Sequence, residues 1–276
     1  MFDRFSRSWE LVKASASVLR SDKELLVFPV LSGIAAMLVV ATFIVPVFAL
    51  KLFEGGMGVG GAIVGFLFYL CQYFVIFFFN AALVAAAMIR LEGGDPTVSD
   101  GFRAARERIV PILGYAAIAA TVGLLLQAMK NKQNNFLVRI AGSLLGVGWT
   151  LATFLVVPVL VQQDVGPIDA LKRSVELLKR TWGENAIGNV GIGLVFGLAM
   201  FCLVAVGVGF VFLAYAASPA LAITVAVFFV LAAVMLGIVQ SALSGIYAAA
   251  LYRYATVGEA PPGFAGTAMQ SAFAPR

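Results

Sequence analysis

Residues 98–129 read VSDGFRAARERIVPILGYAAIAATVGLLLQAM, and they contain the pattern on which the whole chain is built. Apolar residues recur by threes and fours at Val98, Phe102, Ala105 and Ile109, which places them on one face of a helix. Arginines occupy the opposite face, and an apolar run long enough to cross a bilayer follows directly. The stretch therefore predicts an amphipathic helix at the membrane surface that leads into a transmembrane span.

Two further segments of this kind begin near Phe2 and Ile168, and each also runs into a pair of apolar stretches. Their apolar faces consist of Phe5, Trp9, Val12, Ala16 and Leu19 in the first, and of Leu171, Val175, Leu178 and Trp182 in the third. The chain therefore divides into three repeats, at about 2–92, 95–163 and 167–260. The ends Ala85–Arg90 and Ala248–Arg253 resemble each other, whereas the middle unit ends less similarly at Gln162.

The composition belongs to a membrane protein. Of 276 residues, 62% are hydrophobic and 12% are charged, against about 45–50% and 25% in soluble domains. The predicted spans lie at about 26–50, 58–89, 109–129, 137–161, 187–213 and 219–252. We predict an all-α polytopic membrane protein with six transmembrane helices, in three repeats of one amphipathic interfacial helix plus two spans. A single transmembrane domain would cover 1–260, and 261–276 would form a disordered tail.

The distribution of Lys and Arg predicts the orientation. Fifteen of the 19 Lys and Arg lie on the side that carries the amphipathic segments, and the other four are Lys51, Lys130, Lys132 and Arg139. We therefore expect both termini in the cytoplasm, in the inner (plasma) membrane. The charged segment before the first span is expected to remain as an anchor, because it does not fit a cleavable signal peptide.

The amphipathic segments carry charges of both signs, so they differ from the polybasic surfaces that bind nucleic acids or anionic membranes. Asp169 and Arg173, like Glu176 and Arg180, are spaced for ion pairs along a helix. We therefore expect no nucleic-acid partner and no general attraction to anionic surfaces. The expected partners are membrane lipids, and a membrane-protein partner or a second copy of the chain.

Catalytic chemistry finds little support. The chain has no histidine, no predicted span has an acidic residue at its middle, and Cys71 and Cys202 lie within spans as expected of reduced packing residues. Glu92, Asp95 and Asp164 lie at span ends, where capping and ion pairing account for them. We therefore expect no catalytic residues, no metal, no cofactor and no enzymatic activity.

Uncharged polar residues inside the spans are the candidate site. They are Asn80, Gln240, Gln72, Ser244 and Asn189, of which Asn80 and Gln240 belong to repeat-related spans. Two interpretations stay open: hydrogen bonds between helices, of order 1 kcal/mol each, or the lining of a cavity. Trp149, near the middle of a span, either lines a cavity or fills a gap between helices. Pro46, Pro158 and the glycines of the fifth span are compatible with broken helices, although packing of small residues is favoured.

Anchors at the membrane surface are expected at Trp9, Trp182, Arg90 and Arg253. The two tryptophans occupy similar places in the first and third units, and tryptophan is common at membrane interfaces. The two arginines end matching spans, where their side chains can reach lipid headgroups.

Several motifs carry a family resemblance. They are Phe5–Trp9, Asp22–Leu26 with Phe28-Pro29, Pro158–Leu160, Gly166–Ser174 and Lys179–Glu184. In these the chain resembles a family of uncharacterised prokaryotic integral membrane proteins, over nearly its whole length. It is more distantly similar to the membrane domain of some glycerophosphodiester phosphodiesterases. The resemblance implies no catalytic residues, and the phosphodiesterase domain itself has no counterpart here.

Two functions follow as hypotheses. The first is a non-enzymatic integral membrane protein that binds lipid or a partner protein, or organises the membrane. The alternative is a passive or facilitated transporter of a small neutral or amphipathic molecule. A water-accessible cavity lined by Asn80 and Gln240 would favour the transporter, and a dry interior packed with Gly and Ala would favour the first.

Overall fold

The computed structural model describes residues 2–49, 59–130, 136–181, 186–261 and 264, and the chain is 90% helical without strands in that part. The helices are α1 (Phe2–Ser21), the 3₁₀ helix η1 (Lys23–Leu26), α2 (Val27–Ala49), α3 (Val59–Leu91), α4 (Val98–Glu107), α5 (Ile109–Lys130), α6 (Phe136–Ala152), α7 (Val156–Gln162), α8 (Pro167–Thr181), α9 (Ala186–Ala217) and α10 (Pro219–Val257). Six segments in the described part are helical, long and apolar enough to cross a membrane. The prediction of an all-α membrane protein with six spans is confirmed.

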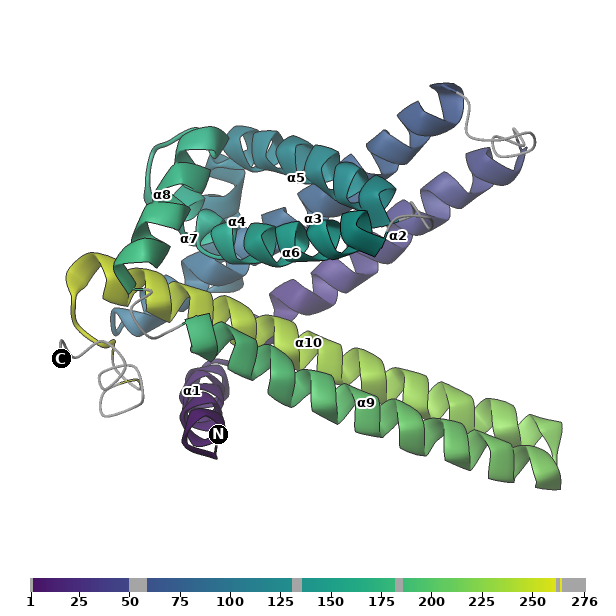
Figure 1. Cartoon of the computed structure of the whole chain (residues 1–276). Coiled ribbons are helices and arrows are strands. Elements are labelled where there is room, and N and C mark those ends of the chain that lie inside the picture. Colours follow the sequence, from purple (N-terminus) through teal and green to yellow (C-terminus); the bar gives the residue numbers. More distant parts are fainter. Residues whose placement is uncertain (1, 50–58, 131–135, 182–185, 262–263, 265–276) are drawn as a thin grey trace.

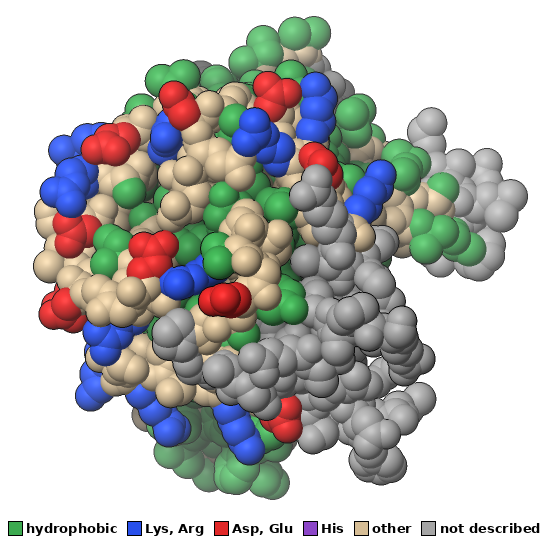
Figure 2. Space-filling model, turned by 90° about the vertical axis from the view of Figure 1, so that its left-hand side faces the viewer, with side chains coloured by type: hydrophobic (Ala, Val, Ile, Leu, Met, Phe, Trp, Pro, Cys, Tyr) green, Lys and Arg blue, Asp and Glu red, His purple; other side chains and the backbone are tan. Residues whose placement is uncertain are grey.

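The spans form three hairpins, α2–α3, α5–α6 and α9–α10, and the hairpin α9–α10 diverges from α2–α3 toward the right of Figure 1. Helices α1, α4 and α8, whose amphipathic character stays a prediction, lie at the other end, and each precedes one hairpin in the chain. Viewed from that end, Lys, Arg, Asp and Glu side chains are intermixed over the surface (Figure 2). This surface is called the charged face below. The division of the chain into three repeats stays a prediction.

Helix α3 is the centre of the bundle, because it packs against α2, α4, α5, α7 and α10. It contacts α10 at Gly245, and the alanine-rich segments 81–87 of α3 and 248–250 of α10 are almost fully buried. An ideal Cβ on Gly245 would lie 2.5 Å from Leu83 Cδ2, so any larger residue there would force the Leu83 side chain to move. Small residues allow such close approach in lipid, where burial of apolar surface does not drive helices together.

The surface helices begin where the sequence indicates. Thr97 caps α4 in a capping box: Asp100 N–H donates to Thr97 Oγ1 (3.2 Å), and Thr97 N–H donates to Asp100 Oδ2 (3.0 Å). The Thr97 hydroxyl also donates to Asp100 Oδ2 (2.6 Å), and this bond, together with the one from Thr97 N–H, holds the pKa of the Asp100 carboxyl below its ordinary value. Pro167 is the first residue of α8, a position that does not need its missing N–H.

The fourth span differs from the prediction of one continuous helix over 137–161. It is divided into α6 and α7 by a turn at residues 153–155. Pro158 explains the position of the turn, because proline lacks an N–H and its ring clashes with the carbonyl of Phe154, four residues earlier. Leu155 N–H donates instead to Ser174 Oγ of α8 (3.2 Å), and this hydroxyl donates to the Ala152 carbonyl (2.7 Å). The glycine-rich α9, by contrast, is one helix over its described length.

Candidate functional site: a neutral cavity among the spans

A cavity of about 430 Å³ lies among α2, α3, α5, α6, α7 and α10. Its polar lining includes Asn80 of α3, Ser241 and Ser244 of α10, and Thr150 and Thr153 at the end of the fourth span's first helix. Aromatic rings form much of the remaining wall, among them Tyr73, Phe77, Tyr115, Trp149 and Phe154. The cavity therefore combines hydrogen-bonding groups with apolar surface, inside segments that are long enough to span a membrane.

Three of these polar side chains have no hydrogen-bond partner among the described residues. Asn80, Ser241 and Ser244 make no side-chain hydrogen bond to any residue that the structure describes. The threonines differ, because Thr150 Oγ1 donates to the Gly146 carbonyl (2.9 Å) and Thr153 Oγ1 to the Trp149 carbonyl (2.8 Å). Hydrogen-bonding capacity is therefore concentrated where α3 meets α10.

The α3–α10 contact also sets the position of Asn80. The missing side chain at Gly245 leaves room for the Asn80 amide, whose Oδ1 would lie 3.3 Å from a Cβ at that position. Asn80 is about 15 Å along α3 from Arg90, since a helix rises 1.5 Å per residue. With Arg90 at the membrane surface, the amide would lie near the middle of a hydrocarbon core about 30 Å thick.

The cavity is closed toward the charged face. Leu83, Val157 and Ala248 are the lining residues nearest to that face on their helices, and all three are buried. Farther from it, Ile76, Thr150 and Ser241 are exposed. The exposed lining residues thus lie on the part of the cavity that is farther from the charged face.

The chemistry available in the cavity is neutral hydrogen bonding. Its lining contains no Asp, Glu, Lys, Arg or Cys among the described residues. An unpaired charge in such a place is costly, so a ligand's polar part has to be uncharged to bind well. No group of three or more Cys, Asp or Glu side chains in the described ranges could hold a metal ion.

The structure separates the five polar residues singled out in the sequence. Asn80 and Ser244 line the cavity. Gln72 Nε2 instead donates to the Ala36 carbonyl of α2 (3.2 Å), a hydrogen bond between helices, and its Oε1 is buried without a described partner. Gln240 is not among the lining residues, so it does not join Asn80 there. The side chain of Asn189 lies outside the described residues.

Trp149 does line the cavity, whereas Tyr73, Tyr115 and Phe154 belong to a wall that sequence reasoning missed. Phe77 stacks on Tyr115, with ring centroids 4.5 Å apart, and Phe154 lies 6.0 Å from Tyr247. The available signal for Phe154 was its position four residues before Pro158. For Tyr115, the signal was a phenol hydroxyl within an alanine-rich span.

The two expected arginine anchors bind the turn after α3. Arg253 Nη1 donates to the Leu91 carbonyl (2.5 Å), and Arg90 Nη1 donates to the Gly94 carbonyl (3.3 Å) and lies 3.5 Å from Asp95 Oδ1. Asp22 is influenced by the charges of Arg90 and Asp95, but burial dominates and raises the pKa of this carboxyl. The contact of these arginines with headgroups stays a prediction.

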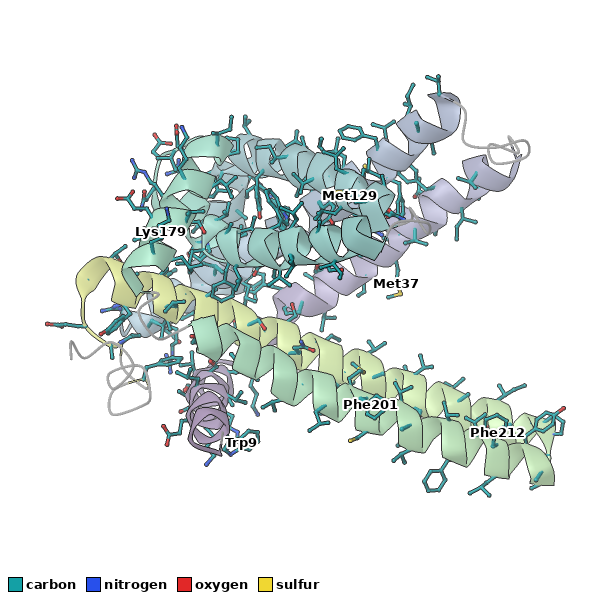
Figure 3. All side chains as sticks on the ribbon, in the orientation of Figure 1. Trp9, Met37, Met129, Lys179, Phe201 and Phe212 are labelled. Carbon is teal, nitrogen blue, oxygen red and sulfur yellow. The ribbon has the colours of Figure 1, made fainter. Side chains whose placement is uncertain are left out.

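Of the two expected tryptophan anchors, only one can be placed. Trp9 is 44% exposed on α1, with Lys13 Nζ 5.9 Å from its ring centroid (Figure 3). Trp182 lies outside the described residues. The role of both side chains at the membrane surface stays a prediction.

Comparison with known proteins places the chain in a family. A family model described as a family of unknown function, DUF6159, matches residues 59–263, which is more than half of the chain. No curated protein and no solved structure matches. The distant similarity to the membrane domain of glycerophosphodiester phosphodiesterases stays a prediction. A match of this extent establishes membership, and the chain belongs to DUF6159, a family of unknown function.

Proposed function

We propose that this protein is a non-enzymatic membrane protein that binds a lipid-like amphipathic molecule in the cavity around Asn80 and Ser244. The observation that carries the proposal is the set of neutral polar side chains without described partners, which face a space among the spans. An apolar ligand body would contact the aromatic wall, while an uncharged hydroxyl, carbonyl or amide would bind Asn80 and Ser244. A polar group in hydrocarbon gains from such partners, because lipid tails offer none.

We place the protein in the inner (plasma) membrane, with both termini in the cytoplasm. The distribution of Lys and Arg supports it. The cavity would then open toward the bilayer and away from the cytoplasm. A ligand would enter laterally from the membrane, as expected for a molecule that partitions into lipid.

The absence of enzymatic activity is part of the proposal. An acyl or phosphoryl transfer would need a nucleophile with a base, or charged groups that stabilise a transition state. The described lining offers only hydroxyls, one amide, the indole and phenols. Ser244 has no general base beside it among these lining residues, which supports a binding role for its hydroxyl.

Replacement of Asn80 tests the proposal. Wild type and Asn80→Leu are extracted in polymer-bounded native nanodiscs, and the co-purified small molecules are quantified by mass spectrometry. We expect a compound class that is enriched with the wild type and reduced about tenfold in Asn80→Leu, the effect of losing hydrogen bonds worth about 1.4 kcal/mol.

Thr121→Leu is the matched control, because this exposed hydroxyl on α5 bonds to the Ala117 carbonyl of its own helix (2.9 Å) and does not line the cavity. The control should retain the wild-type profile. Identical profiles for wild type, Asn80→Leu and Thr121→Leu would reject ligand binding at this cavity.

Transport is the second candidate, and the presence of a polar cavity favours it. A carrier would also have to open toward the charged face, where Leu83, Val157 and Ala248 now close the cavity. Proteoliposomes that contain a fluorescent glucosylceramide, whose uncharged sugar headgroup crosses a protein-free bilayer slowly, separate the two functions, with dithionite quenching of the outer leaflet as readout. If the protein binds without transporting, the lipid should cross the bilayer at the same rate as in protein-free vesicles. A faster rate with the wild type, which is lost in Asn80→Leu, would establish that the protein is a carrier.

A further inference from the structure

A second groove, separate from the cavity, lies between α6 and the surface helix α8. Its volume is about 210 Å³, and it is lined by Gly148, Leu151, Ala152, Val175, Leu178 and Lys179. Lys179 is the single charged residue in this lining, and the other five present carbon. The groove thus joins a span to a surface helix, at the depth where acyl chains meet headgroups.

Glycine at position 148 provides the space in this groove. An ideal Cβ on Gly148 would meet no atom within 4 Å. Leu144 lies one turn earlier on the same face of α6 and is 68% exposed. The groove therefore continues as an exposed apolar strip along α6, away from the charged face, in the direction that a lipid acyl chain would follow.

Lys179, like Arg20 and Arg106, has no ion pair with the described part of the chain, and of these three cations it is the one that lines this groove. Lys172 pairs with Asp169 (3.3 Å), and Arg108 pairs with Asp164. Lys179 is exposed, and no ion pair joins it to the described part of the chain. Its place on α8 is marked in Figure 3. An unpaired ammonium at the groove is complementary to an anion and would be unfavourable beside a second cation.

We infer that this groove binds one anionic phospholipid, with an acyl chain along Gly148 and Leu144 and the phosphate at the Lys179 ammonium. A zwitterionic headgroup fits less well, because it would bring its own cation close to Lys179. The mixed charge of the surface helices argues against a general attraction to anionic membranes, so the selectivity is assigned to this one position. The inference does not depend on the cavity around Asn80 or on its ligand.

The test measures lipid binding to the purified full chain in detergent by native mass spectrometry, with dioleoylphosphatidylglycerol and dioleoylphosphatidylcholine as probes. The wild type should bind dioleoylphosphatidylglycerol more tightly than dioleoylphosphatidylcholine. Lys179→Gln should weaken that binding about fivefold, the effect of one lysine at an anionic surface, and leave the choline lipid unchanged. Gly148→Leu should weaken both, because the side chain fills the groove.

Two variants serve as matched controls. Lys172→Gln removes a cation that is already paired with Asp169, and Gly146→Leu adds the same side chain to α6 at a glycine that has open space and does not line the groove. Both should bind as the wild type does. Equal affinity of the wild type for the two lipids, or equal effects of Lys179→Gln and Lys172→Gln, would overturn the inference. If Gly148→Leu does not fold, the comparison of Lys179→Gln with Lys172→Gln decides the outcome.

Discussion

At the scale of single residues, the position of a polar side chain around its helix decides what it does in this bundle. Ser241, Ser244, Gly245 and Ala248 line the cavity from one face of α10, whereas Gln240, at the edge of that face one turn before Ser244, is not part of the lining. Asn80 and Gln72 are separated in the same way on α3, where one faces the cavity and the other bonds to α2. Two amides of similar polarity in the same helix therefore have different roles: one lines the cavity, and the other joins two helices by a hydrogen bond.

Asp22 gives a residue-scale prediction about pH. Burial raises the pKa of its carboxyl above the ordinary 3.8, so the folded protein holds this proton more tightly than the unfolded chain. The resulting stabilisation is fully present below the unfolded value and is lost as the pH rises through the raised pKa. At pH 7 the buried charge is therefore a cost, and Asp22→Asn should raise Tm.

The asparagine keeps the oxygen that accepts from Glu24 N–H (3.2 Å), so the cap of η1 survives the change. The gain in Tm over the wild type should shrink as the pH is lowered toward 3.8. Asp95→Asn, at a carboxylate that is 98% exposed, should show no gain at pH 7. A lower Tm for Asp22→Asn at pH 7, or a gain that does not depend on pH, would contradict this account.

At the scale of elements, the junction between α6, α7 and α8 depends on Ser174. This buried hydroxyl bonds to both sides of the turn that divides the fourth span, at Leu155 N–H and at the Ala152 carbonyl. Ser174→Ala would leave both backbone groups without that partner, and unsatisfied buried groups cost about 1–3 kcal/mol. We expect a clearly lower Tm in the same detergent.

Ser174→Thr keeps the hydroxyl and should restore most of the stability, which a role in packing alone would not predict. Ser21→Ala removes an exposed hydroxyl that bonds within α1, to the Ser17 carbonyl (2.8 Å), and should change the stability by less than about 0.5 kcal/mol. Equal Tm values for Ser174→Ala and Ser21→Ala would contradict the assignment of this junction to the serine.

The sequence predicts the helices well and their junctions less well. Apolar length identifies the six spans, and Thr97 and Pro167 indicate where two of the surface helices begin. Proline alone does not predict the break in the fourth span, because Pro46 lies inside α2 without interrupting it. At the turn before Pro158, Leu155 N–H and the Ala152 carbonyl bond to Ser174 of α8, a contact between segments that local sequence does not show.

The sequence predicts that the candidate site consists of uncharged polar side chains, but it does not predict which residues packing brings together around the cavity. Uncharged polar residues in apolar spans indicated Asn80 and Ser244, which the cavity brings together. Helix α10 is apolar around its whole circumference, so its sequence does not distinguish a face toward lipid from a face toward other helices. The aromatic wall, including Tyr115 and Phe154, depends on packing between hairpins and could not be derived from one segment.

At the scale of the whole molecule, the diverging hairpins leave much apolar surface for the bilayer. Phe201 and Phe212 of α9 are 71% and 72% exposed and point away from the bundle (Figure 3). In water such a surface would drive aggregation, whereas in a membrane it is solvated by acyl chains. The charged face at the opposite end and this apolar arm together support a fixed orientation in the bilayer.

Cysteine labelling in intact cells checks that orientation. With Cys71 and Cys202 replaced by alanine, a cysteine at position 132 should react with an impermeant maleimide added outside, and a cysteine in the tail at position 270 should not. The reason is the placement of fifteen of 19 Lys and Arg on the expected cytoplasmic side. A shielded position 132 together with a labelled position 270 would reverse the topology.

The central claim is that the neutral cavity among the spans holds an amphipathic molecule. A density map of the protein in native lipid, inspected between Asn80 and Ser244, tests it most directly. We predict density that is continuous with the bilayer, whose polar end lies within hydrogen-bonding distance of both side chains and which is lost in Asn80→Leu. A cavity that contains only water, or one closed by a direct contact between α6 and α10, would contradict the claim.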